Sequence, residues 1–533
     1  MSGIDEAMRD SVVAGRAVLG IELGSTRIKA CLVGDDPSSI IATGSHEWEN
    51  ELIDGVWTYS DDNIWSGLQA AYADLVANLE ARLGVTPTRF GAIGVSAMMH
   101  GYLAFDGSGQ LLTPFRTWRN TSTAVASAQL SAEFGVNIPL RWSIAHLHQA
   151  VLDGEVHVPH IHSITTLAGY VHRRLTGRNA LGVGDASGMF PIDPATNDFD
   201  AGLLAQYDGL ARGTGLSTPL RELLPEVLIA GQPAGELTAA GAALLDPSGV
   251  LEAGIALCPP EGDAGTGMVA TGAIAPRSGN VSAGTSIFAM VVLERPLAHA
   301  HSELDVVVTP VGAPVAMVHC NNGASEIAAW VAMFARFSES AGLILDGDAI
   351  YELLFREALL GDADAGGLFA YNQVAGEPIA GLEEGRPLFV RTPESRLTLA
   401  NTMRAQLYGV FATLALGMRI LADEGVELDR MFAHGGMFRT AGVASRFLAA
   451  ALDAPVSTST TAGEGGAWGM AVLAAFARSG DEGDLSDYLR DRVFASADLS
   501  TAEPVAEDVA GFADYLDRYR AGLDVVRAAI TAF

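Results

Sequence analysis

Two segments far apart in the chain share one pattern, and this repetition constrains the fold more than any other feature. Residues 18–33 read as an apolar strand, a short polar turn and a second apolar strand, and residues 279–292 repeat that order. Each segment predicts a β-hairpin. The turn residues are Gly24, Ser25 and Thr26 in the first copy and Gly284, Thr285 and Ser286 in the second. Because one hairpin opens each half of the chain, the sequence predicts two similar halves with a cleft between them.

The chemistry of these turns suits a bound anion. Glycine permits a positive φ, so backbone N–H groups and hydroxyls can converge on a phosphate. Glu22 lies on the apolar strand before the first turn, and Lys29 lies on the strand after it. A carboxylate on a buried strand needs a partner, and Mg²⁺ is a suitable one. Alone, such a turn is more often only an ordinary turn. The first turn is not a Walker P-loop, since no Gly-Lys-Ser/Thr opens a helix there.

Length and charge exclude several classes of protein. A chain of 533 residues is too long for one core, and 49% hydrophobic with 18% charged residues indicates a globular protein. The net charge of −31 argues against nucleic acid and against anionic membrane surfaces as partners. Residues 1–16 lack a signal-peptide core, and no apolar run is long enough to span a membrane. Three scattered cysteines indicate reduced thiols, so we expect a cytoplasmic protein.

Polar residues follow the predicted strands at their ends. Strand and helix patterns alternate after the first hairpin, which predicts a sheet with helices on its faces, and ligands bind at strand ends of such sheets. The strand at 90–96 ends near Met99 and His100. Trp118 and Asn120 follow another apolar segment. His100 is either a packed histidine or a ligand-binding one, and Trp118 is either a core residue or a face on which a sugar ring stacks.

Three further segments bear on chemistry. The strand at 250–257 runs into Asp263, a candidate general base that would also suit a helix N-cap. Gly435, Gly436 and Met437 form a third glycine-rich segment, between an apolar stretch and a helical pattern. Six histidines lie in residues 142–182, but their spacing does not favour a metal site over packed or solvated histidines.

The ordered set of segments resembles the FGGY family of carbohydrate kinases over roughly residues 17–476. The motifs that carry the resemblance are Gly20-Ile-Glu-Leu-Gly-Ser-Thr26, Met99-His100-Gly101, Asp185-Ala-Ser-Gly188, Leu224-Pro225-Glu226, Gly262-Asp263, Gly284-Thr285-Ser286, Gly435-Gly436 and Glu464-Gly-Gly-Ala-Trp-Gly469. Each motif is weak alone, and the order is specific. The Met-His-Gly element is most similar to xylulokinases and related pentulose kinases.

The resemblance implies an α/β protein of two RNase H-like (actin/hexokinase/Hsp70-like) domains around a central catalytic cleft that binds ATP, Mg²⁺ and a sugar. Asp263 would take the proton from a primary hydroxyl of a ketopentose resembling xylulose or ribulose. Residues 24–26, 284–286 and Lys29 would face the phosphates, and residues 435–437 would line the adenosine pocket. Met99, His100, Trp118, Asn120 and Asp263 would contact the sugar, and Glu22 and Asp263 would hold the metal ion.

The family pattern also sets the expected boundaries: a leader at 1–16, a sugar-binding domain at 17–275, a nucleotide-binding domain at 276–478 and an acidic helical tail at 479–533. This chain departs from the pattern at Glu22, where the family usually has Asp, and at Asn120, where it has an acid. Alternatives are a kinase of the same family for glycerol, erythritol, rhamnulose or gluconate, and a nucleotide- or sugar-binding homologue without turnover. A homodimer is the assembly considered, and the sequence does not determine it.

Overall fold

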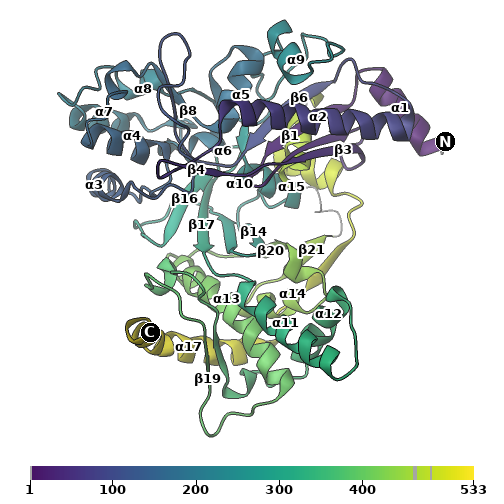
Figure 1. Ribbon diagram of the computed structural model, residues 1–533, viewed down its shortest axis with the longest axis vertical. Helices are drawn as coiled ribbons and strands as arrows, with labels where there is room; N and C mark the ends of the chain where they lie inside the picture. The colour runs from purple at the N-terminus through teal and green to yellow at the C-terminus, as the bar shows by residue number, and fades with distance from the viewer. Residues whose placement is uncertain (1–2, 460–464, 481–482) are drawn as a thin grey trace. The chain divides into compact units, whose positions relative to one another are not determined.

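The computed structural model describes residues 3–459, 465–480 and 483–533 (Figure 1). The chain forms two compact units, each described by itself. Unit 1 consists of Met1–Ile274, Val306–Val315 and Thr461–Ala497, and unit 2 of Ala275–Asp305, Ala316–Thr460 and Asp498–Phe533. The first crossing between units falls at the expected domain boundary. The chain passes between the units again after Asp305, Val315, Thr460 and Ala497, which are not expected boundaries. These later division points are set by packing rather than by local composition.

A five-stranded sheet organises unit 1, in the order β13-β6-β1-β2-β3. Its strands are β1 (Val18–Leu23), β2 (Arg27–Val33), β3 (Ile40–Glu47), β6 (Ala92–Ala97) and β13 (Glu261–Gly262). The predicted hairpin is confirmed: β1 runs antiparallel to β2, with Glu22 opposite Lys29. On its other side β1 pairs in parallel with β6.

Helices α2 (Asp61–Leu83) and α15 (Gly465–Ser479) pack against this sheet. The Ser60 hydroxyl caps α2 by accepting from the N–H of Asn63 at 3.2 Å. Helix α15 approaches β1 closely at Gly20, where a Cβ would lie 2.2 Å from the carbonyl oxygen of Ala467. Only glycine permits this contact. Glu464, which precedes α15, lies outside the described residues.

Unit 2 repeats the central motif of unit 1. Its seven-stranded sheet has the order β16-β17-β15-β14-β20-β21-β22. The strands are β14 (Ser278–Ala283), β15 (Ile287–Val292), β16 (Leu304–Val308), β17 (Pro314–Cys320), β20 (Arg430–His434), β21 (Val456–Ser459) and β22 (Leu499–Ala502). The hairpin β14–β15 is antiparallel, and β20 pairs in parallel with β14. The predicted internal repeat is therefore confirmed at the level of topology.

Helix α13 (Leu399–Asp423) forms the core of unit 2. It is long and apolar enough to cross a membrane by length and composition, but 72% of its most apolar window is buried within the protein. A core helix passes the same test, and the burial of residues such as Leu407, Phe411 and Leu414 identifies α13 as one.

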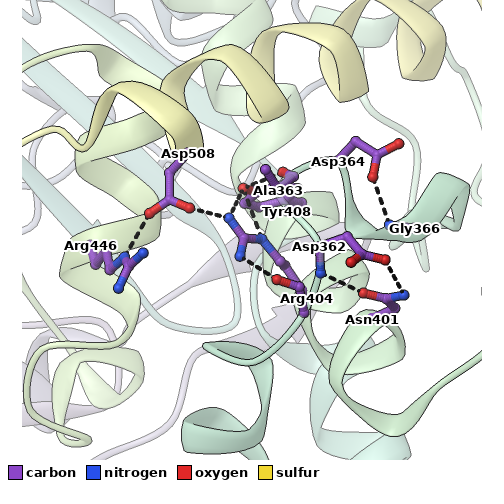
Figure 2. A network of polar contacts seen from close by, with 10 residues as sticks. Asp362, Ala363, Asp364, Gly366, Asn401, Arg404, Tyr408, Arg446 and Asp508 are labelled. Carbon is purple, nitrogen blue, oxygen red and sulfur yellow. Dashed lines mark hydrogen bonds and ion pairs between the residues drawn. The ribbon is translucent and has the colours of Figure 1, made fainter.

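Segments near both ends of the described chain are integrated into the fold. Residues Gly3–Val13 form α1, whose Val12 is 3% exposed and packs in the core of unit 1. Strand β22 adds antiparallel to β21 at the edge of the second sheet. Helix α17 (Ala506–Ala532) is held at its start by Asp508, which forms ion pairs with Arg404 and Arg446 (Figure 2).

Candidate active site

The turn between β1 and β2 is fixed through its carbonyl groups. Trp48 donates its indole N–H to the carbonyl oxygen of Gly24 at 2.7 Å, and the Tyr59 hydroxyl donates to that of Ser25 at 2.6 Å. The two aromatic rings stack with centroids 4.0 Å apart, so both donors lie on one side of the turn. In a trans peptide the carbonyl and the next N–H point in opposite directions. The N–H groups of Ser25 and Thr26 therefore face the other side, together.

The turn between β14 and β15 uses the same device with different donors. The N–H of Ala324 donates to the carbonyl oxygen of Gly284, and that of Gly323 donates to the carbonyl oxygen of Thr285, both at 2.8 Å. By the same argument, the N–H groups of Thr285 and Ser286 face away from residues 323–324. Successive N–H groups on one side of a turn form a concave donor suited to an anion. Each unit thus presents one such turn.

The third glycine-rich segment lies beside the second turn. Strand β20 pairs with β14 so that His434 is opposite Ser282. Gly435 follows with φ +110°, and a Cβ there would lie 2.3 Å from the carbonyl oxygen of Ala283. This close approach with a positive φ requires glycine. Gly436 and Met437 belong to the short helix η4 (Gly436–Phe438), and Met437 is buried. The structure therefore brings residues 284–286 and 435–437 together within unit 2.

Asp263 is the first residue of helix α10 (Asp263–Thr271), directly after β13. The N-cap of α10 is Gly262, so Asp263 does not cap this helix. Its Oδ1 accepts from the backbone N–H of Met99 at 3.0 Å. Burial raises the pKa of Asp263, and the N–H of Met99 opposes that shift. A base is most effective when its pKa lies near the working pH, and a raised carboxyl pKa moves in that direction.

Glu22 lies on β1 within electrostatic reach of Asp263. Burial raises the pKa of Glu22 to about 7; Lys29 opposes this shift and Asp263 adds to it. The start of α15 covers the carboxylate, since a Cβ on Gly466 would lie 2.2 Å from Oε1 of Glu22. Among the described residues, no group of three or more His, Cys, Asp or Glu side chains is arranged to hold a metal ion. These two carboxylates are thus a pair rather than a complete cage.

Two further buried carboxyl groups, Glu261 and Asp185, lie close to Asp263 in the fold, and the sequence pattern gave neither of them a role in the site. Oε2 of Glu261 accepts from the N–H of Asp185 at 2.9 Å, and Oε1 lies 3.3 Å from the N–H of Gly184. A Cβ on Gly182 or Gly184 would collide with this carboxylate, at 2.1 and 2.4 Å. Asp185 in turn accepts from the Thr166 hydroxyl at 2.6 Å. The position of Glu261, two residues before Asp263, is the only sequence signal for this arrangement.

These contacts link three distant segments. Burial raises the pKa of Asp185 to about 7 and that of Glu261 to about 8. Gly188, at the end of the Asp185 segment, lies against the next segment, because a Cβ there would lie 2.6 Å from Nδ1 of His100. Residues 99–101, 184–188 and 261–263 therefore form one packed group.

His100 is buried and strained. It has φ +72°, a left-handed conformation that is uncommon for a residue with a side chain, and Nδ1 lies 3.4 Å from the carbonyl oxygen of Gly188. Such strain persists where the surroundings fix the backbone, and it is concentrated at functional sites. His100 is thus packed against Gly188 in a strained conformation, and a role in ligand binding stays a prediction.

The segment at 118–120 is used differently from the family pattern. The Asn120 amide donates to the carbonyl oxygens of Trp57 and Thr117, at 2.8 and 3.0 Å, and accepts from the N–H of Trp57 at 2.9 Å. Both of its amide hydrogens are thus committed to backbone. Trp118 is 38% exposed, which excludes a core role for it. Asn120 therefore holds the short hairpin that carries Trp57, while Trp118 remains available for stacking.

Comparison with known proteins places this geometry in a family. Residues 17–255 match the N-terminal domain, and residues 279–478 the C-terminal domain, of the FGGY family of carbohydrate kinases. A xylulose kinase of Streptomyces rubiginosus is 24% identical over 243 residues, which span 42% of this chain and 45% of that relative. The aligned region thus covers less than half of this curated relative.

Solved structures share the fold over nearly the whole chain. A xylulose kinase from Rhodospirillum rubrum superposes with a TM-score of 0.78 at 21% identity, covering 96% of this chain and 99% of that one. A gluconate kinase from Lactobacillus acidophilus gives 0.76 at 17% identity, with 96% and 99% covered. These likenesses confirm the actin/hexokinase-like fold of two sheet-containing domains. Since the two family matches together cover most of the sequence, the chain belongs to the FGGY family of carbohydrate kinases, which are sugar phosphotransferases that use ATP.

Proposed function

We propose that this protein is a kinase that transfers the γ-phosphoryl group of ATP to a primary hydroxyl of a ketopentose similar to xylulose or ribulose. The observation that carries the proposal is the pair of turns at 24–26 and 284–286. In each turn, two successive carbonyl groups accept hydrogen bonds on one side. Two successive N–H groups therefore face the opposite side. Phosphates are bound by such groups in an acidic protein that has few cations to spare. Residues 435–437, beside the second turn, are the proposed adenosine contacts.

Asp263 is the proposed general base. The N–H of Met99 donates to its Oδ1, and Oδ2 is the oxygen that would accept the proton of the substrate hydroxyl. The hydroxyl oxygen then forms a bond to the γ-phosphorus as the bond between that phosphorus and the bridging oxygen of ADP breaks. Most of the rate enhancement in such transfers comes from positioning and charge stabilisation. The strained His100 and the exposed Trp118 are the proposed sugar contacts, together with Met99.

Glu22 and Asp263 suit a magnesium ion. Their mutual repulsion contributes to the raised pKa of Glu22, and a cation beside them would relieve it. Mg²⁺ is typically bound by one or two carboxylates, with water and substrate phosphates completing its shell. When bound, the ion would neutralise charge on the phosphate oxygens. Lys29, opposite Glu22 in the hairpin, is the cation proposed to face the phosphates.

A second substrate class within the family is favoured by Asn120. Asn120 is a neutral amide, so it has no carboxylate to offer a sugar hydroxyl. Both of its amide hydrogens are also bound to backbone carbonyl groups. A polyol or sugar acid such as gluconate therefore remains a candidate substrate.

Three buried free cysteines suit a reducing compartment, and we place the protein in the cytoplasm. The net charge of −31 argues against nucleic acid or an anionic membrane as a partner.

A substrate panel tests the proposal. Purified protein would be assayed for ADP release with MgATP and each of xylulose, ribulose, rhamnulose, erythritol, glycerol and gluconate. We expect turnover with a ketopentose and phosphorylation of a terminal carbon, as read by phosphorus NMR. Turnover with gluconate or glycerol alone would move the assignment to the second class. Absence of ADP release with every compound, from protein that is folded by circular dichroism, would remove the kinase proposal.

A further inference from the structure

Helix α17 lies beyond the region that matches the family model, which ends at residue 478, yet it connects to the turn at 284–286. The connection runs through residues of unit 2 that are almost fully buried. They are Asn322 (1% exposed), Asn372 (1%), Gln373 (0%), Glu377 (0%) and Tyr519 (0%). Backbone hydrogen bonds make the first link of this path, and side-chain hydrogen bonds make the later ones.

The path begins behind the turn. Residues 323–324 hold its two carbonyls, and their position therefore sets the direction of the N–H groups of Thr285 and Ser286. A Cβ on Gly323 would lie 2.4 Å from the carbonyl oxygen of Gly284, so the two backbones are in direct contact. Any shift of residues 323–324 would move the proposed phosphate donors with it.

Asn322 fixes this segment to the loop at 372–377. Its Nδ2 donates to Oε2 of Glu377 at 2.9 Å and to the carbonyl oxygen of Ala375 at 3.1 Å, and its Oδ1 accepts from the N–H of Ala375 at 2.9 Å. Asn372 adds two bonds of 3.1 Å, from its Nδ2 to the carbonyl oxygens of Asn322 and Gly323. The loop thus holds both the side chain and the backbone of the segment behind the turn.

Helix α17 fixes the loop. Gln373 donates from Nε2 to the Tyr519 hydroxyl at 2.5 Å, and the Tyr371 hydroxyl donates to the carbonyl oxygen of Tyr519 at 3.1 Å. The rings of Tyr371 and Tyr519 stack with centroids 4.5 Å apart. The helix itself is anchored at its start by the ion pairs of Asp508 (Figure 2). Tyr519 is therefore a rigid support for the loop.

We infer that α17 positions the phosphate-binding turn of unit 2, with Tyr519 and Asn322 as positioning residues for the nucleotide. The inference rests on the proposed function in that it takes residues 284–286 as the site of a nucleoside di- or triphosphate. It assigns a role to the C-terminal helix, and it names side chains that do not themselves touch the nucleotide. Because the path lies wholly within unit 2, it affects nucleotide binding and leaves the sugar contacts of unit 1 unchanged.

Two matched tyrosine variants test the inference. Tyr519→Phe removes the hydroxyl that Gln373 contacts. Tyr515→Phe, one helical turn earlier, removes a buried hydroxyl that forms hydrogen bonds with the backbone of Ala370 and Ala405. MgADP affinity would be measured by calorimetry, and the exchange of amide hydrogens in residues 279–290 by mass spectrometry. We expect Tyr519→Phe to weaken MgADP binding by about 3- to 10-fold and to speed exchange at the turn, with the KM for sugar unchanged.

Tyr515→Phe should match the wild type in both measurements, although it loses a comparable buried hydroxyl. Asn322→Ala should weaken MgADP binding further than Tyr519→Phe does; if it fails to fold, Tyr519→Phe alone decides. Wild-type exchange at the turn and wild-type MgADP affinity in Tyr519→Phe would overturn the inference. A wild-type protein that does not bind MgADP would instead remove the nucleotide assignment, and the exchange measurement would still decide whether α17 positions the turn.

Discussion

The backbone N–H of Met99 lies 3.0 Å from Oδ1 of Asp263 and donates a hydrogen bond to it. This contact joins the segment that follows β6 to the start of α10, which are 164 residues apart in the sequence. It helps to fix the orientation of the carboxyl group, together with the other backbone N–H groups that act on it. The proposed role of Asp263 as a base depends on this orientation as much as on its raised pKa.

Asp263→Asn should abolish transfer and spare nucleotide binding. The amide keeps the shape and can still accept from Met99, but it cannot take a proton. We expect kcat to fall by about 10²- to 10⁴-fold, the usual contribution of a general base. The affinity for ADP, measured by calorimetry without Mg²⁺, should stay near the wild-type value, because the proposed phosphate contacts are backbone N–H groups. Retention of wild-type kcat would contradict the assignment.

Glu22→Gln should weaken the response to magnesium. Removing the charge leaves Asp263 as the only one of the two proposed carboxylate ligands, and a loss of about 1.4 kcal/mol corresponds to a tenfold weaker affinity. The Mg²⁺ concentration for half-maximal ADP release should therefore rise by about tenfold or more. Glu22→Asp, which keeps the charge on a shorter side chain, is the matched control and should respond at lower Mg²⁺ than Glu22→Gln. Identical magnesium curves for all three proteins would exclude Glu22 as a ligand.

Asp508→Ala should strongly destabilise unit 2. Arg404 is 2% exposed and Asp508 is 3% exposed, so the substitution leaves a buried guanidinium without its carboxylate (Figure 2). Breaking such a pair costs about 3–5 kcal/mol of the free energy of unfolding. Asp517→Ala on the same helix removes the partner of Arg419 at an exposed site and should cost less than about 1 kcal/mol. Urea unfolding compares the two, and equal effects would contradict the prediction.

His172→Gln should make the free energy of unfolding less dependent on pH in the acidic range. Burial lowers the pKa of His172 to about 4, whereas an unfolded histidine has a pKa of about 6.5. Between these values the unfolded state binds the proton and the folded state does not. The stability contribution is therefore complete above pH 6.5 and is lost as the pH falls, at up to about 1.4 kcal/mol per pH unit.

Glutamine can still donate to the carbonyl oxygen of Ala234, which lies 2.9 Å from Nε2 of His172. Urea unfolding at several pH values between 4 and 7 would measure the slope for the wild type and the variant. Other titrating groups are common to both proteins, so the difference in slope belongs to His172. Parallel curves would show that His172 does not contribute.

The sequence identified the two hairpins because alternating apolar strands and glycine-containing turns are local patterns. The strand expected at 250–257 is not formed, and Asp263 follows the two-residue strand β13 (Glu261–Gly262) instead. The resemblance to one kinase family required only the order of such motifs. The sequence pattern did not reveal that Trp48 and Tyr59 donate hydrogen bonds to the carbonyl groups of the first turn. It also did not reveal that Gly323 and Ala324 donate to those of the second. Those donors are distant in sequence and carry no local signature.

The sequence alone therefore determined the two-fold repeat, the fold class and the proposed base, since each depends on contacts between neighbours in the chain. Only the tertiary structure decided the use of Asn120 as a backbone clamp, the burial of Glu261 against Gly182 and Gly184, and the integration of α17 into unit 2. Each of these is set by which surfaces meet when the sheets and helices pack. Packing joins residues tens to hundreds of positions apart, and side-chain hydrogen bonds between such residues leave no periodicity in the sequence.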